Sequence, residues 1–249
     1  ARYEEYARSI LPRRFEFILL EGPIRLTLKS LLKSLGRKEL FIEEHAITQA
    51  QFREIRETLR GVRVIPSDGT LNEIRMVKDA DEIEILRRAA RLTDQCFSHL
   101  LSFVKPGMTE WDIALEIEFF YRKNGCRRSS FDPIVASGAG SSMPHYETSM
   151  KKRVNEGEVL LVDMGCHLEG YNSDLTRTVF INSIDPALES IYTIVRNAQR
   201  NALEAIRPGI TTGKLDSMAR DYITGAGYGE YFGHSLGHGY GLEIHELPA

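Results

Sequence analysis

The stretch that decides the fold is Glu158-Val-Leu-Leu-Val-Asp163-Met-Gly-Cys-His-Leu-Glu-Gly-Tyr-Asn-Ser-Asp174-Leu-Thr-Arg-Thr-Val-Phe-Ile181. Two runs rich in β-branched and apolar residues flank a short polar segment, a pattern typical of a β-hairpin. If the turn is centred on Leu168-Glu169, Asp163 lies directly opposite Asp174. Directly opposed residues of an antiparallel pair share one face, with Cβ atoms about 5 Å apart. The sequence therefore predicts two neighbouring carboxylates on one hairpin.

The surroundings of this carboxylate pair are expected to be apolar. The first strand is apolar on both faces from Val159 to Val162, so the pair is predicted to be buried. Two opposed, buried carboxylates repel each other and lose their hydration, which a divalent cation or a single shared proton would relieve. A displaced turn that leaves one aspartate in solvent is a further alternative.

Histidines favour the metal among these alternatives. His234, His238 and His245 lie close together in the segment from Phe232 to Glu246, which is rich in glycine. Glycine disfavours a regular helix and lets the backbone approach a ligand or another strand. One histidine alone is more often a packing or surface residue. Three in one glycine-rich segment, in a chain that buries paired aspartates, indicate a metal site.

A helix–turn–helix pattern occurs twice around the hairpin. The spacing predicts a helix over 79–104 and another over 195–206, and each is followed by a Pro-Gly stop, a threonine that restarts a helix, and a glycine at its end. Pro106, Gly107, Thr109 and Gly125 correspond to Pro208, Gly209, Thr211 and Gly227. Such self-similarity predicts a duplicated half with a cleft between the copies. The segment with His145 follows the first copy much as the segment with His238 follows the second.

Residues 1–76 have a different pattern. Strands are predicted over 15–20, 39–43 and 62–65, and they alternate with helices over 24–35 and 48–59. This alternation indicates a small α/β unit with parallel strands. No catalytic pattern is present in it, so a structural or oligomerising role is expected.

Composition excludes several classes of function. The net charge of −3 is too small to indicate nucleic acid or an anionic membrane as a partner. The longest apolar runs, such as Phe17 to Leu20, are far shorter than a membrane span, and no secretion signal is evident. Three scattered cysteines favour a reducing cytoplasm over a disulfide framework. The glycine-rich run from Ser137 to Ser142 lacks the lysine of a phosphate-binding loop, and no serine-nucleophile motif is present.

Three motifs resemble those of one family of metallopeptidases, the Xaa-Pro aminopeptidases and Xaa-Pro dipeptidases (prolidases). The motifs are Pro133-Ile-Val-Ala-Ser-Gly through His145-Tyr146, Val162-Asp163-Met-Gly through Thr178, and Gly237-His238-Gly-Tyr-Gly-Leu-Glu-Ile-His245-Glu246. The resemblance implies an α+β, pita-bread catalytic domain with a pseudo-two-fold internal repeat over 77–249. It also implies that residues 1–76 are part of a small α/β, creatinase-like N-terminal domain.

The resemblance implies a role for each candidate residue. Asp163, Asp174 and His238 would bind two divalent metal ions, by family habit Mn²⁺, with Co²⁺ or Zn²⁺ as alternatives. His145 and His245 would be catalytic and donate hydrogen bonds to the developing oxyanion. His234 would bind substrate on the proline side. The substrate would be a proline-containing peptide cleaved at its N-terminal Xaa-Pro bond, and the enzyme a cytoplasmic homodimer.

Two departures from the family pattern are expected to matter. Two glutamate ligands, one of them the general base, would lie beyond residue 249, and the front of the N-terminal domain would precede residue 1. The chain by itself is therefore expected to be C-terminally incomplete and inactive. A non-catalytic binding or chaperone module and a metal-free, creatinase-type amidinohydrolase are alternatives, which the presence of all three candidate ligands disfavours. Aminopeptidase and dipeptidase activity are not separated by the sequence.

Overall fold

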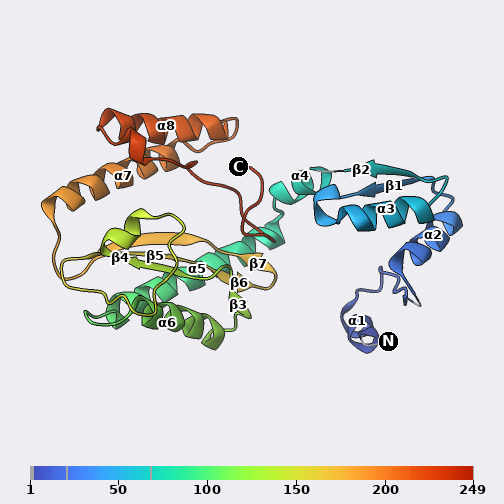
Figure 1. Ribbon diagram of the computed structural model, residues 1–249, viewed down its shortest axis with the longest axis horizontal. Helices are drawn as coiled ribbons and strands as arrows, with labels where there is room; N and C mark the ends of the chain where they lie inside the picture. Colours follow the sequence, from blue (N-terminus) through green and yellow to red (C-terminus); the bar gives the residue numbers. More distant parts are fainter. Residues whose placement is uncertain (1–2, 21, 68, 249) are drawn as a thin grey trace. The chain divides into compact units, whose positions relative to one another are not determined.

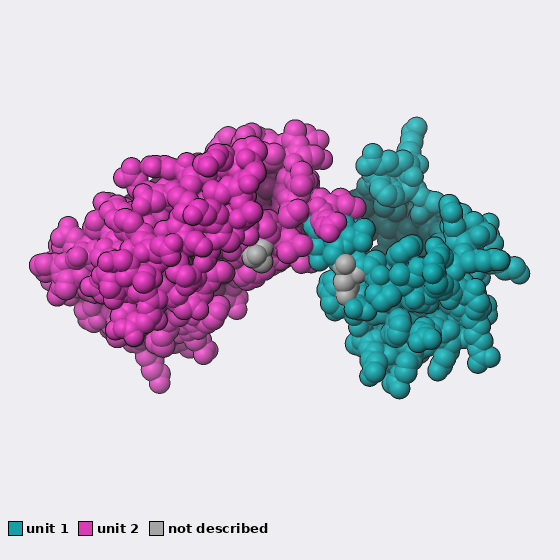
Figure 2. Space-filling model, turned by 90° about the horizontal axis from the view of Figure 1, so that it is seen from above, with its two compact units in different colours: residues 1–72 teal, residues 73–249 magenta. Residues whose placement is uncertain are grey.

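A computed structural model describes residues 3–20, 22–67 and 69–248. The chain divides into two compact units, residues 1–72 and 73–249 (Figure 2). The division falls within α4 (Thr70–Met76), close to the boundary at residue 76 that the sequence predicts. No helix among the described residues is both long enough and apolar enough to cross a membrane.

The first unit is a small α/β arrangement. It contains the helices α1 (Glu4–Ile10), α2 (Ile24–Ser34) and α3 (Gln49–Thr58), the short 3-10 helix η1 (Glu44–Ala46), and the strands β1 (Glu39–Ile42) and β2 (Arg63–Pro66). The strands β1 and β2 pair in parallel, as the alternation of strand and helix predicts. Thr48 caps α3, and its hydroxyl accepts a hydrogen bond from the backbone N–H of Gln51.

The strand predicted over residues 15–20 is wrong. Residues 16–20 belong to no strand, and the only sheet described in this unit is the pair β1 and β2. Phe15 and Leu20 are exposed. An extended segment is stabilised as a strand by a hydrogen-bonded neighbour and a buried face, and the described residues give this segment neither.

The second unit contains two antiparallel sheets and two helix pairs (Figure 1). One sheet has the order β4-β5-β8 and the other β3-β6-β7. The strands are β3 (Arg128–Ser129), β4 (Ile134–Ser137), β5 (Val159–Met164), β6 (Cys166–Leu168), β7 (Tyr171–Asn172) and β8 (Leu175–Phe180). The helices are α5 (Ala80–Phe103), α6 (Glu110–Lys123), α7 (Pro186–Ala205) and α8 (Thr212–Gly225), with the short 3-10 helices η2 (Gly138–Ser142) and η3 (Gly229–Tyr231).

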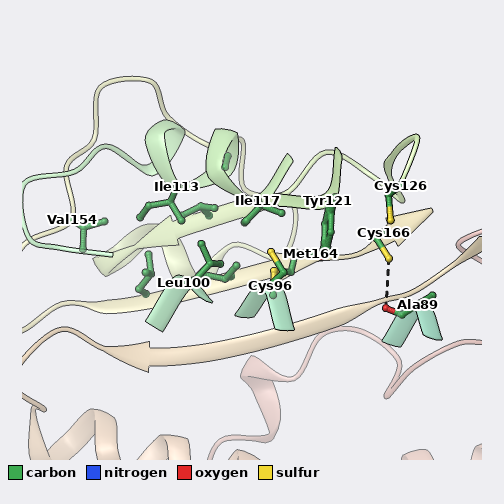
Figure 3. Packing of buried hydrophobic residues seen from close by; sticks show 14 of the residues in the cluster. Ala89, Cys96, Leu100, Ile113, Ile117, Tyr121, Cys126, Val154, Met164 and Cys166 are labelled. Carbon is green, nitrogen blue, oxygen red and sulfur yellow. Dashed lines mark hydrogen bonds between the residues drawn. The ribbon is translucent and has the colours of Figure 1, made fainter. Parts of the chain in front are cut away.

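The main core lies between the helices α5 and α6 and the sheets. Figure 3 shows Ile113, Ile117 and Tyr121 of α6 gathered with Cys96 and Leu100 of α5, all of them buried. The burial pattern of β5 alternates, so that Leu160, Val162 and Met164 point into this core and Asp163 points to the other face. A smaller core of Ala198, Ala202, Ala219 and Ile223 joins α7 to α8.

The two helix pairs share the local geometry that the sequence repeat predicts. The glycines of both Pro-Gly stops have positive φ, +92° at Gly107 and +91° at Gly209. Both second helices are 14 residues long. Thr109 and Thr211 cap them in the same way, each accepting a hydrogen bond from the backbone N–H three residues later. The two-fold relation between the pairs stays a prediction.

The hairpin is present, but its register differs from the predicted one. The turn lies at Glu169 and Gly170, which have φ values of +50° and +96°, and Asp163 pairs with Thr176 instead of Asp174. Glycine adopts positive φ at no steric cost, which favours a turn centred one residue later than predicted. Asp163 and Asp174 are therefore diagonal neighbours on one face of the hairpin.

Gly165 marks the place where the hairpin passes from one sheet to the other. It separates β5 from β6 on the first arm, and Ser173 and Asp174 separate β7 from β8 on the second. A Cβ atom on Gly165 would lie 1.9 Å from the carbonyl oxygen of Ser173. Only glycine permits this close approach of the two arms. The break brings Asp174 to the end of the strand that carries Asp163.

Candidate active site

Asp163 and Asp174 form a half-buried acidic pair at the break in the hairpin. The hydroxyl of Thr176 donates a hydrogen bond of 2.7 Å to Oδ1 of Asp163. Burial raises the pKa of Asp163, and the charge of Asp174 raises it further, against the opposing effects of Thr176 and His238. Burial also raises the pKa of Asp174, although His238 and His245 oppose the rise. The anionic forms of both groups are thus disfavoured when no cation is bound.

His238 is oriented toward this pair by its own backbone. Its Nδ1 lies 2.9 Å from the carbonyl oxygen of Gly239, so Nδ1 carries the proton and donates it. Its Nε2 faces Oδ2 of Asp174 at 3.5 Å. The ring of His245 lies against the ring of His238, with 4.3 Å between the ring centroids. The two histidines therefore reach the acidic pair together.

Asn172 fixes the glycine-rich segment that carries these histidines. Its side-chain amide donates to the carbonyl oxygens of Gly241 and Leu242 at 3.1 and 3.0 Å, and its backbone N–H donates to Gly241 at 2.8 Å. Its Oδ1 lies 2.9 Å from Nδ1 of His167. The asparagine is 2% exposed. Sequence reasoning assigned no role to Asn172, and its place two residues before Asp174 is the only signal that it gives.

Glu246 anchors the same segment through charge. Its carboxylate accepts hydrogen bonds from Arg75 at 2.7 Å, from Lys78 at 3.0 Å and from the backbone N–H of Glu243 at 3.0 Å. Burial alone would raise the pKa of Glu246, but these hydrogen bonds outweigh burial and lower it. In the sequence, Glu246 is distinguished only as the last residue of the third motif, and its position beside His245 is the signal for this anchoring role.

Tyr240 also lies at the edge of the pair. Burial raises the pKa of its hydroxyl, and the charge of Asp174 raises it further. It comes from the same segment as His238 and His245.

The remaining predicted residues lie apart from this group. His145 is exposed, in the loop that follows η2. The ring of His234 lies edge-on to Phe232, with 5.2 Å between centroids, and its carbonyl oxygen accepts a hydrogen bond from Arg220 of α8. Among the described residues, no hydrogen bond, ion pair or ring contact joins His145 or His234 to Asp163, Asp174, His238 or His245.

The donor chemistry of the group fits a divalent cation. Because Nδ1 of His238 donates its proton to Gly239, Nε2 of the neutral ring presents a lone pair to a carboxylate oxygen, and only a cation or a second proton relieves that contact. Oxygen donors with one imidazole suit Mn²⁺, Co²⁺ or Zn²⁺. Within the described part of the chain, however, no three His, Cys, Asp or Glu side chains are gathered at metal-ligand spacing. Asp163, Asp174 and His238 are thus suitable in chemistry but not closed around an ion.

Comparisons with known proteins agree with the fold and with the resemblance. A protein of Bacillus subtilis named as an uncharacterized peptidase is 38% identical over 247 residues, 99% of this chain and 69% of its own length. A Pyrococcus furiosus protein named Xaa-Pro dipeptidase is 41% identical over 181 residues, 73% of this chain and 52% of its own length. The chain thus spans about half to two thirds of the length of these relatives.

Solved structures match nearly the whole chain. The Xaa-Pro dipeptidase from Bacillus anthracis superposes with a TM-score of 0.95 at 40% identity, covering 100% of this chain and 69% of that one. The X-Pro aminopeptidase from Thermotoga maritima has a TM-score of 0.91 at 38% identity, covering 100% and 70%. The predicted α+β, pita-bread fold is confirmed by these structures. The model of metallopeptidase family M24 matches residues 84–249, and the chain therefore belongs to metallopeptidase family M24.

Proposed function

We propose that the protein is a dinuclear-metal peptidase that hydrolyses the Xaa-Pro bond at the N-terminus of peptides. The observation that carries this proposal is the approach of His238 to Asp174, 3.5 Å from Nε2 to Oδ2, beside the diagonal carboxylate of Asp163. Family membership and relatives named Xaa-Pro dipeptidase support it.

Asp163, Asp174 and His238 would hold the metal ions. Thr176 would keep Asp163 oriented, as groups behind a ligand commonly do. Three donors are fewer than two divalent cations need, so waters and other side chains would complete the site. We expect Mn²⁺, with Co²⁺ or Zn²⁺ as alternatives. When bound, such ions supply a Lewis acid and lower the pKa of water.

His245 would act on the substrate. Its ring touches that of His238, which places it beside the cation site, and it would donate a hydrogen bond to the oxygen of the scissile carbonyl as negative charge develops there. His145 would donate in the same way from its loop. His234, near the end of α8, would line the pocket for the proline ring.

The proposal includes a homodimer in the cytoplasm. The three cysteines, Cys96, Cys126 and Cys166, are free and buried, which suits a reducing compartment. Dimerisation rests on family resemblance alone, and sedimentation of the full-length protein measures it.

A panel of peptides tests the function. The full-length protein with added Mn²⁺ is expected to cleave Ala-Pro or Ala-Pro-Ala and to leave Ala-Ala and Ala-Ala-Ala intact. Turnover of the dipeptide only would define a dipeptidase, and turnover of the tripeptide an aminopeptidase. Peptide binding without turnover of any member, by a protein shown to be folded and metal-loaded, would instead support a binding module.

A further inference from the structure

Glu110 is a fully buried carboxylate in the first turn of α6, with 0% of its surface exposed. Its Oε1 accepts hydrogen bonds from the backbone N–H and the hydroxyl of Ser137, at 2.7 and 2.8 Å. Its Oε2 accepts from the hydroxyl of Tyr146 at 2.9 Å and from the backbone N–H of Ser149 at 3.1 Å. All four donors are uncharged groups.

These donors lie at the two ends of one loop. Ser137 is the last residue of β4, and Tyr146 and Ser149 lie toward the end of the 138–149 loop, which contains η2 and His145. The ring of Tyr146 also packs closely against Gly140 of the loop. A Cβ atom added at Gly140 would lie only 2.9 Å from that ring. A single carboxylate thus joins the beginning and the end of the segment that presents His145.

The four hydrogen bonds specify a carboxylate at this position. Burying a charge without a counterion is costly, so its retention requires several good donors. Each carboxylate oxygen accepts one backbone N–H and one hydroxyl. A hydroxyl can rotate and accept a hydrogen bond, but a backbone N–H cannot. Glutamine in place of Glu110 would therefore point its NH₂ group at a backbone N–H in either orientation of the amide.

We propose that Glu110 is a positioning residue that holds the 138–149 loop so that His145 reaches the scissile carbonyl. This role rests on the proposed peptidase function, in which His145 donates to the developing negative charge. Glu110 does not touch substrate and acts only through the loop. The exposed position of His145 makes such a constraint necessary, because few contacts of its own ring hold it in place.

Activity of the full-length protein tests the coupling. Losing an oxyanion donor costs about 10²–10³ in rate, so His145→Ala is expected to lower kcat by that factor. Glu110→Gln is expected to lower kcat by about 10-fold or more, with metal content and KM nearly unchanged. The double variant should be no slower than His145→Ala, because Glu110 acts through His145. Losses that multiply in the double variant would overturn the proposal.

A matched control separates the loop from the helix. Glu116 is also on α6. Its carboxylate lies 2.7 Å from Nε2 of His99, a residue of α5 that is not part of the loop. Glu116→Gln is expected to keep kcat within about 2-fold of the wild type. If Glu110→Gln fails to fold, Tyr146→Phe removes one of the four hydrogen bonds and is expected to lower kcat by a smaller factor with the same dependence on His145.

Hydrogen exchange tests the loop without any activity. Backbone amides of residues 138–149 are expected to exchange at least 10-fold faster in Glu110→Gln than in Glu116→Gln, while those of α5 exchange at equal rates. Equal exchange in the loop would overturn the role of Glu110 whether or not the protein cleaves Xaa-Pro peptides. Failure of the wild type on the peptide panel would overturn the peptidase function and leave the exchange result to decide the role of Glu110 in holding the loop.

Discussion

Nε2 of His238 and Oδ2 of Asp174 face each other at 3.5 Å, and Nδ1 of the same imidazole is engaged by the carbonyl oxygen of Gly239. This separation is longer than a good hydrogen bond and leaves the facing atoms without a strong interaction. Both atoms are metal-ligand types. Variants of His238 and of the neighbouring His245 therefore distinguish a residue that binds metal from one that acts on substrate.

His238→Ala is expected to remove metal and activity together from the full-length protein, because the only imidazole among the three proposed ligands is lost. His245→Ala is expected to lower kcat by about 10²–10³ and to leave metal content nearly unchanged. Elemental analysis beside steady-state kinetics measures both effects. Full metal content in both variants with equal losses of activity would show that the two roles are assigned wrongly.

Removing the charge of Asp163 should change the stability of the metal-free protein. Burial, with a contribution from Asp174, raises the folded-state pKa of Asp163 above its unfolded value, so the folded state binds this proton more tightly. The stabilisation that this bound proton gives the folded state is complete below the unfolded pKa of Asp163. It is lost as the pH rises through the folded pKa. Asp163→Asn is therefore expected to raise the melting temperature at neutral pH. It should also flatten the decline in melting temperature that accompanies rising pH.

Thermal unfolding in the presence of a chelator, from about pH 4 to 8, measures this dependence. Asp132→Asn offers a comparison at an exposed aspartate between β3 and β4. A lower melting temperature of Asp163→Asn at neutral pH without metal would contradict the inferred cost of the buried charge.

The ion pairs of Glu246 should stabilise the second unit. Its side chain is 5% exposed, and those of Arg75 and Lys78 are 23% and 13% exposed. Glu246→Gln leaves Lys78 without its carboxylate partner and Arg75 with only the exposed Glu243. It is expected to lower the free energy of unfolding by about 3 kcal/mol, the lower end for breaking a buried pair. Glu169→Gln, which breaks the exposed pair with Arg88, should scarcely move the unfolding midpoint. Urea unfolding compares the two, and similar shifts would argue against a special role for Glu246.

Two glycines of the hairpin should respond differently to alanine. At Gly165 the new Cβ would lie 1.9 Å from a backbone oxygen, whereas at Gly170 it would meet open space with φ at +96°. Gly165→Ala is expected to cost about 3 kcal/mol or more because two backbone segments must separate. Gly170→Ala should cost about 1–2 kcal/mol from its conformation alone. Equal destabilisation would mean that the hairpin arms do not need their close approach.

The helices and their ends could be predicted from sequence because local chemistry determines them. Asp79 and Thr109 are capping residues with a partner three positions later, and the structure begins α5 and α6 immediately after them. The register of the hairpin could not be predicted in the same way. It depends on which two residues form the turn, and the turn lies at Glu169 and Gly170, one residue later than predicted. The break at Gly165, where the arms change sheets, is a tertiary contact with no local signal.

The candidate site was predictable only in part. Asp163, Asp174 and His238 carry their signal in residue type and spacing, and the structure brings them together with His245. Glu110 and Asn172 were missed because an acidic first turn and an asparagine in a short strand are ordinary local features. Only their burial and their long-range partners distinguish them.

The most direct test of the metallopeptidase assignment is the rate of proline release from an Xaa-Pro dipeptide by the full-length protein, before and after metal is removed. The expected result is turnover that a chelator abolishes and that Mn²⁺ restores, and no restoration in Asp174→Asn. Turnover that persists after metal has been removed to below one ion per ten chains, or that Asp174→Asn retains in full, would contradict it.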